Sequence, residues 1–250
     1  MQITVVIPCY NEAPRLPRTF QEITSFIKDQ LGKQCVITEI IVVDDGSSDE
    51  TIAISTEWLK ALPITIAKHE KNLGKGAALR TGVTKATGDY ILLFDADSAT
   101  PISELPKLCD VMRNNSADIV IGCRNSHQSA GVTVKMSLHR KFIGRVYHAL
   151  TTPLIPNIKD AACGFKLFRA GKAKKLFAFQ QINRFAYDIE ILSLALHLKW
   201  KIVEVPVNWN AIPISKVRIF RDGIEMLFKV IKLYTLKISK RGIFKNLETR

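Results

Sequence analysis

Short apolar runs alternate with stretches of helical periodicity along the first 125 residues. This alternation is typical of strands separated by helices in a mainly parallel sheet. Four β-branched residues follow one another at 40–43, which indicates a strand covered on both faces. The expected strands are Ile3–Ile7, Glu39–Val43, Ile64–Lys68, Tyr90–Phe94 and Asp118–Ile121, and the expected helices lie at 13–31, 49–61, 75–86 and 102–114. These elements predict an α/β, Rossmann-like fold with helices flanking the sheet.

The pattern changes after residue 130. A basic stretch at 133–151 has amphipathic helical spacing, and strand patterns at 163–168 and 200–207 lie on either side of a helix around 187–198. Residues 216–239 place apolar side chains at helical spacing over a wide face, which predicts a basic amphipathic C-terminal helix. We therefore expect one domain over residues 1–212, with halves at about 1–125 and 126–212, followed by a separate basic segment at 213–250.

Positive charge is concentrated at the C-terminal end. The chain has 36 Lys and Arg against 23 Asp and Glu, a net +13. Residues 215–250 hold ten Lys or Arg and three Asp or Glu, so a net +7 lies there. Such an excess favours polyanions: nucleic acid, phosphorylated substrates or an anionic membrane surface. A uniformly basic surface kept for solubility is the alternative, and the uneven distribution weakens it.

The two basic amphipathic stretches suit a membrane surface, because an interfacial helix buries its apolar face while Lys and Arg meet lipid phosphates. An ordinary helix packed on the domain would have the same pattern. So would a helix that docks against a second copy of the chain or a membrane-protein partner.

The expected lack of targeting signals and the pattern of cysteines both indicate a protein on the cytosolic side of a membrane. The N-terminus runs directly into a strand pattern, and no stretch approaches the ~18 apolar residues of a span. We expect a peripheral protein without signal peptide or transmembrane span. The five cysteines are scattered, without a CxxC pair, and are expected to be reduced, buried thiols.

Two polar motifs follow the first two strands, where open α/β sheets bind ligands. Pro8-Cys-Tyr-Asn-Glu12 follows strand one, and Asp44-Asp-Gly-Ser-Ser-Asp49 follows strand two. Carboxylates at such a strand end can accept hydrogen bonds from a nucleobase or ribose. A helix cap by Ser48 or Asp49 is the alternative for the second motif, and both roles can hold together.

A glycine-containing motif, Asn72-Leu-Gly-Lys-Gly-Ala-Ala-Leu-Arg80, precedes the third helix. Glycines at a helix start let the backbone approach an anion, and Lys75 adds positive charge. The motif is neither a P-loop nor a dinucleotide fingerprint, which argues against kinase and dehydrogenase functions. A purely structural turn is the alternative.

Two carboxylates separated by one residue, Asp95 and Asp97, follow the apolar run that ends at Phe94. At the exposed end of a strand such a pair can hold a hard divalent cation together with a diphosphate. The cation would neutralise charge that builds up on a departing diphosphate. A solvated acidic turn is the alternative.

In combination, these motifs resemble the family 2 inverting glycosyltransferases of the GT-A fold. The second half is similar to the dolichyl-phosphate glucosyltransferase branch, and slightly less to the mannosyltransferases. The likeness extends over about residues 3–236 and is carried by PCYNE (8–12), VDDGSSDET (43–51), NLGKGAALRTG (72–82), FDAD (94–97), DAACGFKLF (160–168), RFAYDIE (184–190) and EVPVNW (204–209). Two departures are Asp-Ala-Ala at 160–162, where the branch has Asp-Thr-Gln, and the lack of the N-terminal membrane anchor of its eukaryotic members.

The resemblance implies a role for individual residues. The first half of the domain would bind the nucleotide sugar and the second half the acceptor. Asp97, with Asp95, would hold Mg²⁺ or Mn²⁺, and Asp160 and Asp97 would lie at the reacting centre. The implied donor-binding residues are Pro8, Tyr10, Glu12, Asp45, Lys75, Asp95 and Ala96; Arg124 and Arg140 would grip the acceptor phosphate, with Asp188, Glu190 and Lys141 in support.

The implied reaction is transfer of a hexose, glucose from UDP-glucose first, with inversion to a polyprenyl or dolichyl phosphate at the cytosolic membrane surface. A GDP-mannose-dependent enzyme and a family 2 transferase acting on a glycan or another acceptor are the alternatives. A phosphate monoester is mostly dianionic at pH 7, so its oxygen scarcely needs a base. We therefore expect Asp160 to orient groups or stabilise developing positive charge. Nucleic-acid binding is disfavoured, because no binding motif is present and the carboxylates would repel phosphates.

Overall fold

The computed structural model describes residues 1–29, 35–124, 149–210 and 228–235, which share one sheet flanked by helices. The strands are β1 (Gln2–Cys9), β2 (Val36–Asp44), β3 (Ile64–Lys68), β4 (Tyr90–Leu93), β5 (Ile119–Cys123), β6 (Lys166–Arg169) and β7 (Ile202–Pro206). The helices are α1 (Leu16–Lys28), α2 (Thr51–Glu57), α3 (Lys75–Lys85), α4 (Leu105–Asn114), α6 (Ala170–Phe179) and α7 (Tyr187–His197), with short 3₁₀ turns η1 (Trp58–Lys60) and η2 (Ile102–Glu104).

The sheet has the order β3-β2-β1-β4-β6-β5-β7. Every neighbouring pair is parallel except those made by β6, which runs antiparallel between β4 and β5. The mainly parallel sheet predicted from the sequence is confirmed. Because β6 and β7 come from the second half of the chain, both halves build one sheet. The carboxyl ends of β1, β2, β4 and β5 lie at one edge, and β6 begins there.

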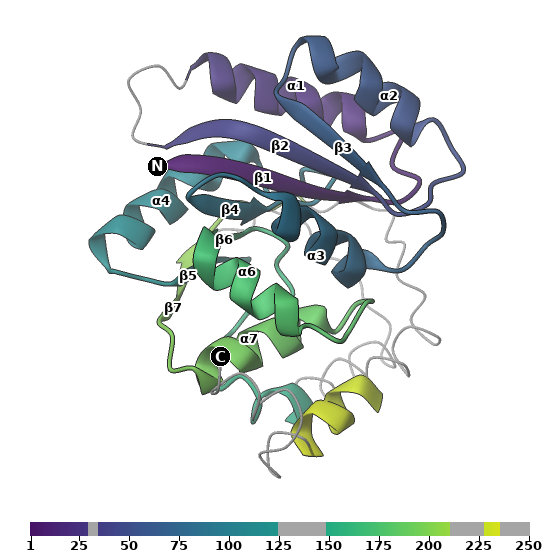
Figure 1. The fold of residues 1–250 in the computed structure, drawn as a ribbon. Helices are drawn as coiled ribbons and strands as arrows, with labels where there is room; N and C mark the ends of the chain where they lie inside the picture. The colour runs from purple at the N-terminus through teal and green to yellow at the C-terminus, as the bar shows by residue number, and fades with distance from the viewer. Residues whose placement is uncertain (30–34, 125–148, 211–227, 236–250) are drawn as a thin grey trace.

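Helices cover both faces of this sheet (Figure 1). α1, α2 and α4 lie on one face, whereas α3 packs on the other against β1 and next to α6. The central strands are accordingly apolar on both sides; Val5 and Val6 of β1, for example, are both fully buried. Close packing of α3 on β1 depends on Gly82, because a Cβ there would lie 2.3 Å from a methyl group of Val6.

The predicted elements differ from the observed ones mainly in the second half. Helix α6 was not predicted, and the expected strand at 163–168 begins at Lys166. Most of the basic stretch at 133–151 lies outside the described residues, and only 149–151 are seen, as helix. Of the stretch at 216–239, residues 228–235 are described and are helical. The domain boundaries at 212 and 213 stay a prediction.

Two further observations concern the chain as a whole. The five cysteines are buried free thiols, as predicted. In the described ranges, no helix has both the length and the apolar character that crossing a membrane requires.

Candidate active site

The turn after β4 carries the paired carboxylates, and residues of α1 form hydrogen bonds with this turn. The hydroxyl of Thr19 donates to the backbone oxygen of Ala96 (2.8 Å), and Ser98 donates to Glu22. Asp97 accepts the backbone N–H of Ala99 at 3.1 Å. Ala96 itself is buried, so its side chain belongs to the core rather than to an open surface. The turn therefore fixes Asp95 and Asp97 at the carboxyl edge of the sheet.

Asp95 lies between a lysine and a glycine. Lys75, the first residue of α3, places its Nζ 2.6 Å from Asp95 Oδ1. On the other side, a Cβ at Gly164 would lie 2.1 Å from Asp95 Oδ2, so only glycine leaves room for the carboxylate. Gly74, just before the helix, has φ +109° and packs against the backbone oxygen of Asn183. The glycines of this motif thus serve close packing.

The electrostatics of the two carboxylates differ. Burial would raise the pKa of Asp95, but the adjacent Lys75, with Lys166 and Arg124 behind it, lowers that pKa overall. Burial and the negative charge of Asp95 both raise the pKa of Asp97. Within the described residues Asp97 forms no ion pair. Of these two carboxylates, Asp97 is therefore the one whose charge is less compensated by the described residues.

Arg124 and Asp160 form a two-pronged ion pair at the end of β5. Arg124 donates from Nε (2.8 Å) and Nη2 (2.7 Å) to the two Asp160 oxygens, and its backbone N–H adds a third bond at 2.9 Å. Glu204 of β7 in turn accepts the backbone N–H groups of Lys159 (3.0 Å) and Asp160 (2.8 Å). Burial opposes ionisation of Asp160, but the bonds from Arg124 prevail and lower its pKa. Asp160 is thus an ionised carboxylate that orients the arginine.

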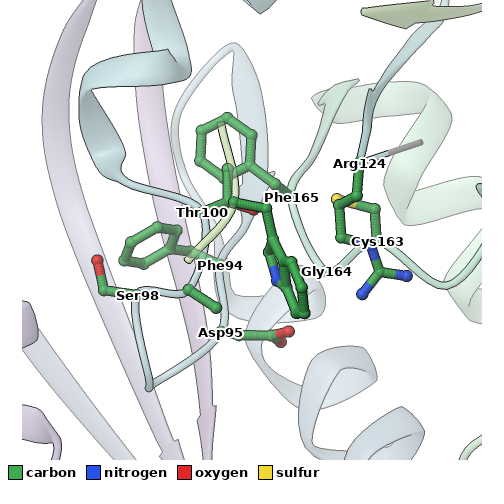
Figure 2. A pocket seen from close by; sticks show the side chains of 10 residues that line it. Phe94, Asp95, Ser98, Thr100, Arg124, Cys163, Gly164 and Phe165 are labelled. Carbon is green, nitrogen blue, oxygen red and sulfur yellow. The ribbon is translucent and has the colours of Figure 1, made fainter. Parts of the chain in front are cut away.

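A small pocket separates these two ion pairs. Phe94 and Phe165 form part of its wall, and the side chains of Asp95 and Arg124 extend toward each other at its rim (Figure 2). Trp209 also lines the pocket, with its ring centroid 5.6 Å from the Arg124 guanidinium carbon. The pocket thus has the guanidinium of Arg124 on one side and the carboxylate of Asp95 on the other, an arrangement that can hold two charged reactants next to each other.

The loops after β1 and β2 are joined by hydrogen bonds. Asn11, at φ 54°, receives the N–H of Ser48 on its side chain (2.8 Å), and its own N–H donates to Ser47. Asp45 is buried and accepts the N–H groups of Leu73 (2.9 Å) and Gly74 (2.7 Å). Asp45 therefore fixes the loop that presents Lys75, and its contact with a nucleobase stays a prediction.

The remaining predicted residues fall into three groups. Pro8 is the penultimate residue of β1, Tyr10 is exposed just beyond it, and Glu12 is paired with Arg15 at 2.9 Å. Asp188 and Glu190 occupy the first turn of α7. Arg140 and Lys141 lie outside the described residues. The structure thus brings the predicted donor-binding residues to one edge of the sheet, whereas their contacts with a donor stay predictions.

The two acidic residues of α7 have structural partners. Glu190 is fully buried and accepts the backbone N–H groups of Gln181 (2.9 Å) and Ile182 (2.8 Å). Burial raises its pKa. Asp188 is ion-paired with the buried Lys166. Both carboxylates are therefore held by partners within the protein, and the supporting role expected for them stays a prediction.

Sequence reasoning assigned no role to four residues that shape the site: Lys166, Gly164, Glu204 and Trp209. Lys166 could have been recognised, because a lysine inside the apolar run of β6 is buried, and a buried charge needs an oppositely charged or hydrogen-bonding partner. Glu204 had a similar signal inside the apolar pattern of β7. The importance of Gly164 depends on a neighbour far away in the sequence, and no local pattern could have revealed it.

A family model decides how this arrangement is classified. The model described as "Glycosyl transferase family 2" matches residues 4–177, which include the strand-end motifs of β1, β2 and β4, and also Arg124 and Asp160. The chain belongs to this family. It is a glycosyltransferase, and the resemblance seen in the sequence is confirmed.

Curated relatives of this family 2 glycosyltransferase extend over most of its length. The dolichyl-phosphate β-glucosyltransferase of Dictyostelium discoideum is 34% identical over 92% of this chain and 73% of its own length. The proteins of the same name from Saccharomyces cerevisiae and Homo sapiens are 34% and 33% identical, each over 90% of this chain, and are covered over 71% and 72%.

Solved structures confirm the GT-A fold of this glycosyltransferase. Glucosyl-3-phosphoglycerate synthase from Mycobacterium tuberculosis, in complex with UDP, superposes with a TM-score of 0.66 at 16% identity over 92% of this chain and 79% of its own. Staphylococcus aureus TarS 1–349, in complex with UDP-GlcNAc, gives 0.61 at 15% identity over 92% of this chain. The chain spans 65% of the TarS fragment, about two thirds of its length. At these identities the likeness shows the fold alone.

Proposed function

We propose that this glycosyltransferase transfers glucose from UDP-glucose to a dolichyl or other polyprenyl phosphate, with inversion, at the cytosolic surface of a membrane. One observation carries the proposal: Asp95, the first of the paired carboxylates, and Arg124 both line the pocket, and their side chains extend toward each other at its rim. The names of the relatives, which agree at 33–34% identity over 90% or more of the chain, support glucose and a lipid phosphate as the reactants.

The donor side fits Mg²⁺ or Mn²⁺ bound together with a diphosphate. Asp95 and Asp97 supply two carboxylates, and magnesium sites commonly combine one or two carboxylates with substrate phosphates. Asp97, whose charge is poorly compensated, is the stronger ligand candidate. Such an ion would neutralise the negative charge of the leaving diphosphate. Lys75 would add a second positive charge on the same side.

The acceptor side fits a phosphate without a general base. Arg124 presents a guanidinium whose orientation is fixed by Asp160, and a guanidinium fork binds phosphate oxygens in pairs. A phosphate monoester is mostly dianionic at neutral pH, so its oxygen can attack the anomeric carbon directly. Asp160, with its lowered pKa, is unsuited to take up a proton at pH 7. Its role is to position Arg124, and catalysis comes from orientation and electrostatics.

The helix at 228–235 supports peripheral attachment to the membrane. Its residues Val230 and Leu233 are buried, whereas Phe228, Ile231 and Tyr234 are 69%, 44% and 41% exposed. These three large side chains recur at three-residue spacing, so they share one side of the helix. An exposed apolar stripe on a basic segment is the feature expected of an interfacial helix.

A transfer assay tests the proposed function. The purified protein is incubated with labelled UDP-glucose, other UDP-sugars or GDP-mannose, together with a polyprenyl phosphate and Mn²⁺ or Mg²⁺. We expect glucose label to enter the lipid phase, the lipid-linked sugar to be β-configured, and EDTA to abolish transfer. Label moving only from GDP-mannose would establish the mannosyltransferase alternative. Transfer to a water-soluble acceptor but not to lipid would contradict the proposal.

A further inference from the structure

Lys75 occupies the position beside Asp95 that a cofactor ion would need to approach. Its Nζ lies 2.6 Å from Asp95 Oδ1, and the two side chains are 26% and 37% exposed. The lysine ammonium is therefore in direct contact with one of the two carboxylates proposed to hold the metal.

Of these two partners, Lys75 is the one that can move. Asp95 has a short side chain wedged against Gly164, where a Cβ would lie only 2.1 Å from its Oδ2. Lys75 has a long side chain with four rotatable carbons at the first turn of α3, next to a site where an anion is favoured. A change of partner would thus be made by the lysine, with the carboxylate staying in place.

The protein alone offers a poor cage for a divalent ion. Across the described residues, no group of three or more His, Cys, Asp or Glu side chains is placed to bind one. The only paired carboxylates of the strand-end turn are Asp95 and Asp97, and Lys75 already neutralises the first. A divalent ion arriving alone would meet one free carboxylate and the repulsion of a lysine ammonium nearby.

We propose that Lys75 is an exchangeable counter-ion: it pairs with Asp95 in the donor-free protein and moves to the donor diphosphate, so that metal and nucleotide bind as a coupled unit. The inference rests on the proposed function, because it assumes a diphosphate and a divalent ion at this turn. The exchange of Lys75 adds a dependence that the fold alone does not imply: tight binding of the metal requires the diphosphate. Metal affinity is low until the diphosphate draws Lys75 away and supplies oxygen ligands itself.

The test measures Mn²⁺ alone, by the electron paramagnetic resonance signal of the free ion, on wild-type protein and on Lys75→Met. Removal of the ammonium leaves Asp95 available and lifts the repulsion, so we expect Mn²⁺ to bind the variant at least tenfold more tightly. Lys75→Arg, which keeps the charge, should match the wild type. Lys85→Met, at the exposed end of the same helix, is the matched control and should also match it.

The same variants are then titrated with UDP in the presence of saturating Mn²⁺, by calorimetry. Lys75→Met should bind UDP at least tenfold more weakly, so one substitution changes the two affinities in opposite directions. Circular dichroism confirms folding, and Lys75→Gln provides a second neutral variant. Unchanged or weaker Mn²⁺ binding by both neutral variants, with normal UDP binding by the wild type, would overturn the counter-ion role and leave the proposed function standing. Absence of any Mn²⁺-dependent UDP binding by the wild type would overturn both.

Discussion

Each of three cationic side chains at the site is paired with a carboxylate: Lys75 with Asp95, Arg124 with Asp160, and Lys166 with Asp188. Burying a charge costs free energy, and an oppositely charged partner with good hydrogen bonds offsets that cost. The sequence predicted five of these six residues as members of the site: four lie in recognisable motifs, and Arg124 was implied by the family resemblance. It could not predict which cation forms an ion pair with which carboxylate, because the partners are distant in the sequence: Asp160 lies 36 positions from Arg124, and Asp188 lies 22 from Lys166.

Replacing Asp160 by Asn should reduce transfer by more than tenfold, about 1.4 kcal/mol in the activation free energy. The amide can accept fewer of the three hydrogen bonds from Arg124, so the guanidinium loses its fixed orientation. Steady-state kinetics should show the loss mainly with the lipid phosphate rather than the sugar nucleotide. Asp110→Asn, which breaks an exposed pair with Arg113, is the control and should leave the kinetics unchanged. A loss below tenfold would contradict a central role for Asp160.

The Arg124–Asp160 pair should also give a defined pH dependence of stability. Arg124 holds the pKa of Asp160 below its ordinary value, so the ionised carboxylate stabilises the folded state above a pH of about 4. That stabilisation is lost as the pH falls through the lowered pKa. Thermal unfolding of wild type and Asp160→Asn should therefore show a difference in Tm at pH 7 that shrinks at pH 3. A difference that stays constant between these pH values would contradict this assignment.

Gly164→Ala should weaken UDP binding in the presence of Mn²⁺ by at least tenfold. The new methyl group would lie 2.1 Å from Asp95 Oδ2, so the carboxylate must leave its place beside Lys75. Crowding of this kind also costs about 1–3 kcal/mol of stability, so binding is measured at a temperature where the variant is folded. Gly171→Ala is the matched control, because nothing lies within 4 Å of a Cβ there and the change favours helix α6. Normal UDP binding by Gly164→Ala would show that Asp95 does not need its present position.

Among the secondary-structure elements, those of the first half were the easiest to predict. Their alternating strands and helices have strong local patterns, and the strand at Ile64–Lys68 was predicted with its exact bounds. Helix α6 was missed because it begins Ala-Gly-Lys and lacks a side-chain cap or a sharp apolar face. The antiparallel direction of β6 could not be predicted either, since it depends on strands β4 and β5 that are distant in the sequence.

Strand β7 contributes to the site through Glu204, and its replacement by Gln tests that contribution. The carboxylate accepts the backbone N–H groups of Lys159, on both oxygens, and of Asp160; glutamine keeps one acceptor oxygen but loses the second and the negative charge that strengthens these bonds. We expect kcat/KM for the lipid phosphate to fall roughly tenfold, about 1.4 kcal/mol, while the KM for the sugar nucleotide stays unchanged. Glu39→Gln is the control: Glu39 accepts bonds from Thr4 and Thr87 at the opposite edge of the sheet. An equal effect of Glu204→Gln on both substrates would indicate general loosening of the fold instead.

On the scale of the whole molecule, the charge of +13 and the exposed apolar stripe of the helix at 228–235 both favour binding to an anionic membrane surface. Electrostatic attraction to anionic lipid acts over about 10 Å at 0.1 M salt and about 3 Å at 1 M. Burying an exposed large apolar side chain contributes about 1.5–3 kcal/mol irrespective of salt. The two contributions can therefore be separated by ionic strength and by mutation.

Co-sedimentation with vesicles containing phosphatidylserine should show wild-type binding at 0.1 M NaCl that falls at least tenfold at 1 M. Replacing Phe228, Ile231 and Tyr234 together by Ser should weaken binding at both salt concentrations, because the apolar contribution is removed. Leu59→Ser, which changes another exposed apolar residue in η1, is the control and should bind like the wild type. Wild-type protein that stays in the supernatant, but forms dimers abolished by the triple replacement, would instead assign the stripe to a second copy of the chain. Membrane contact would then have to come from elsewhere, because the same side chains cannot be buried in a dimer and in lipid at once.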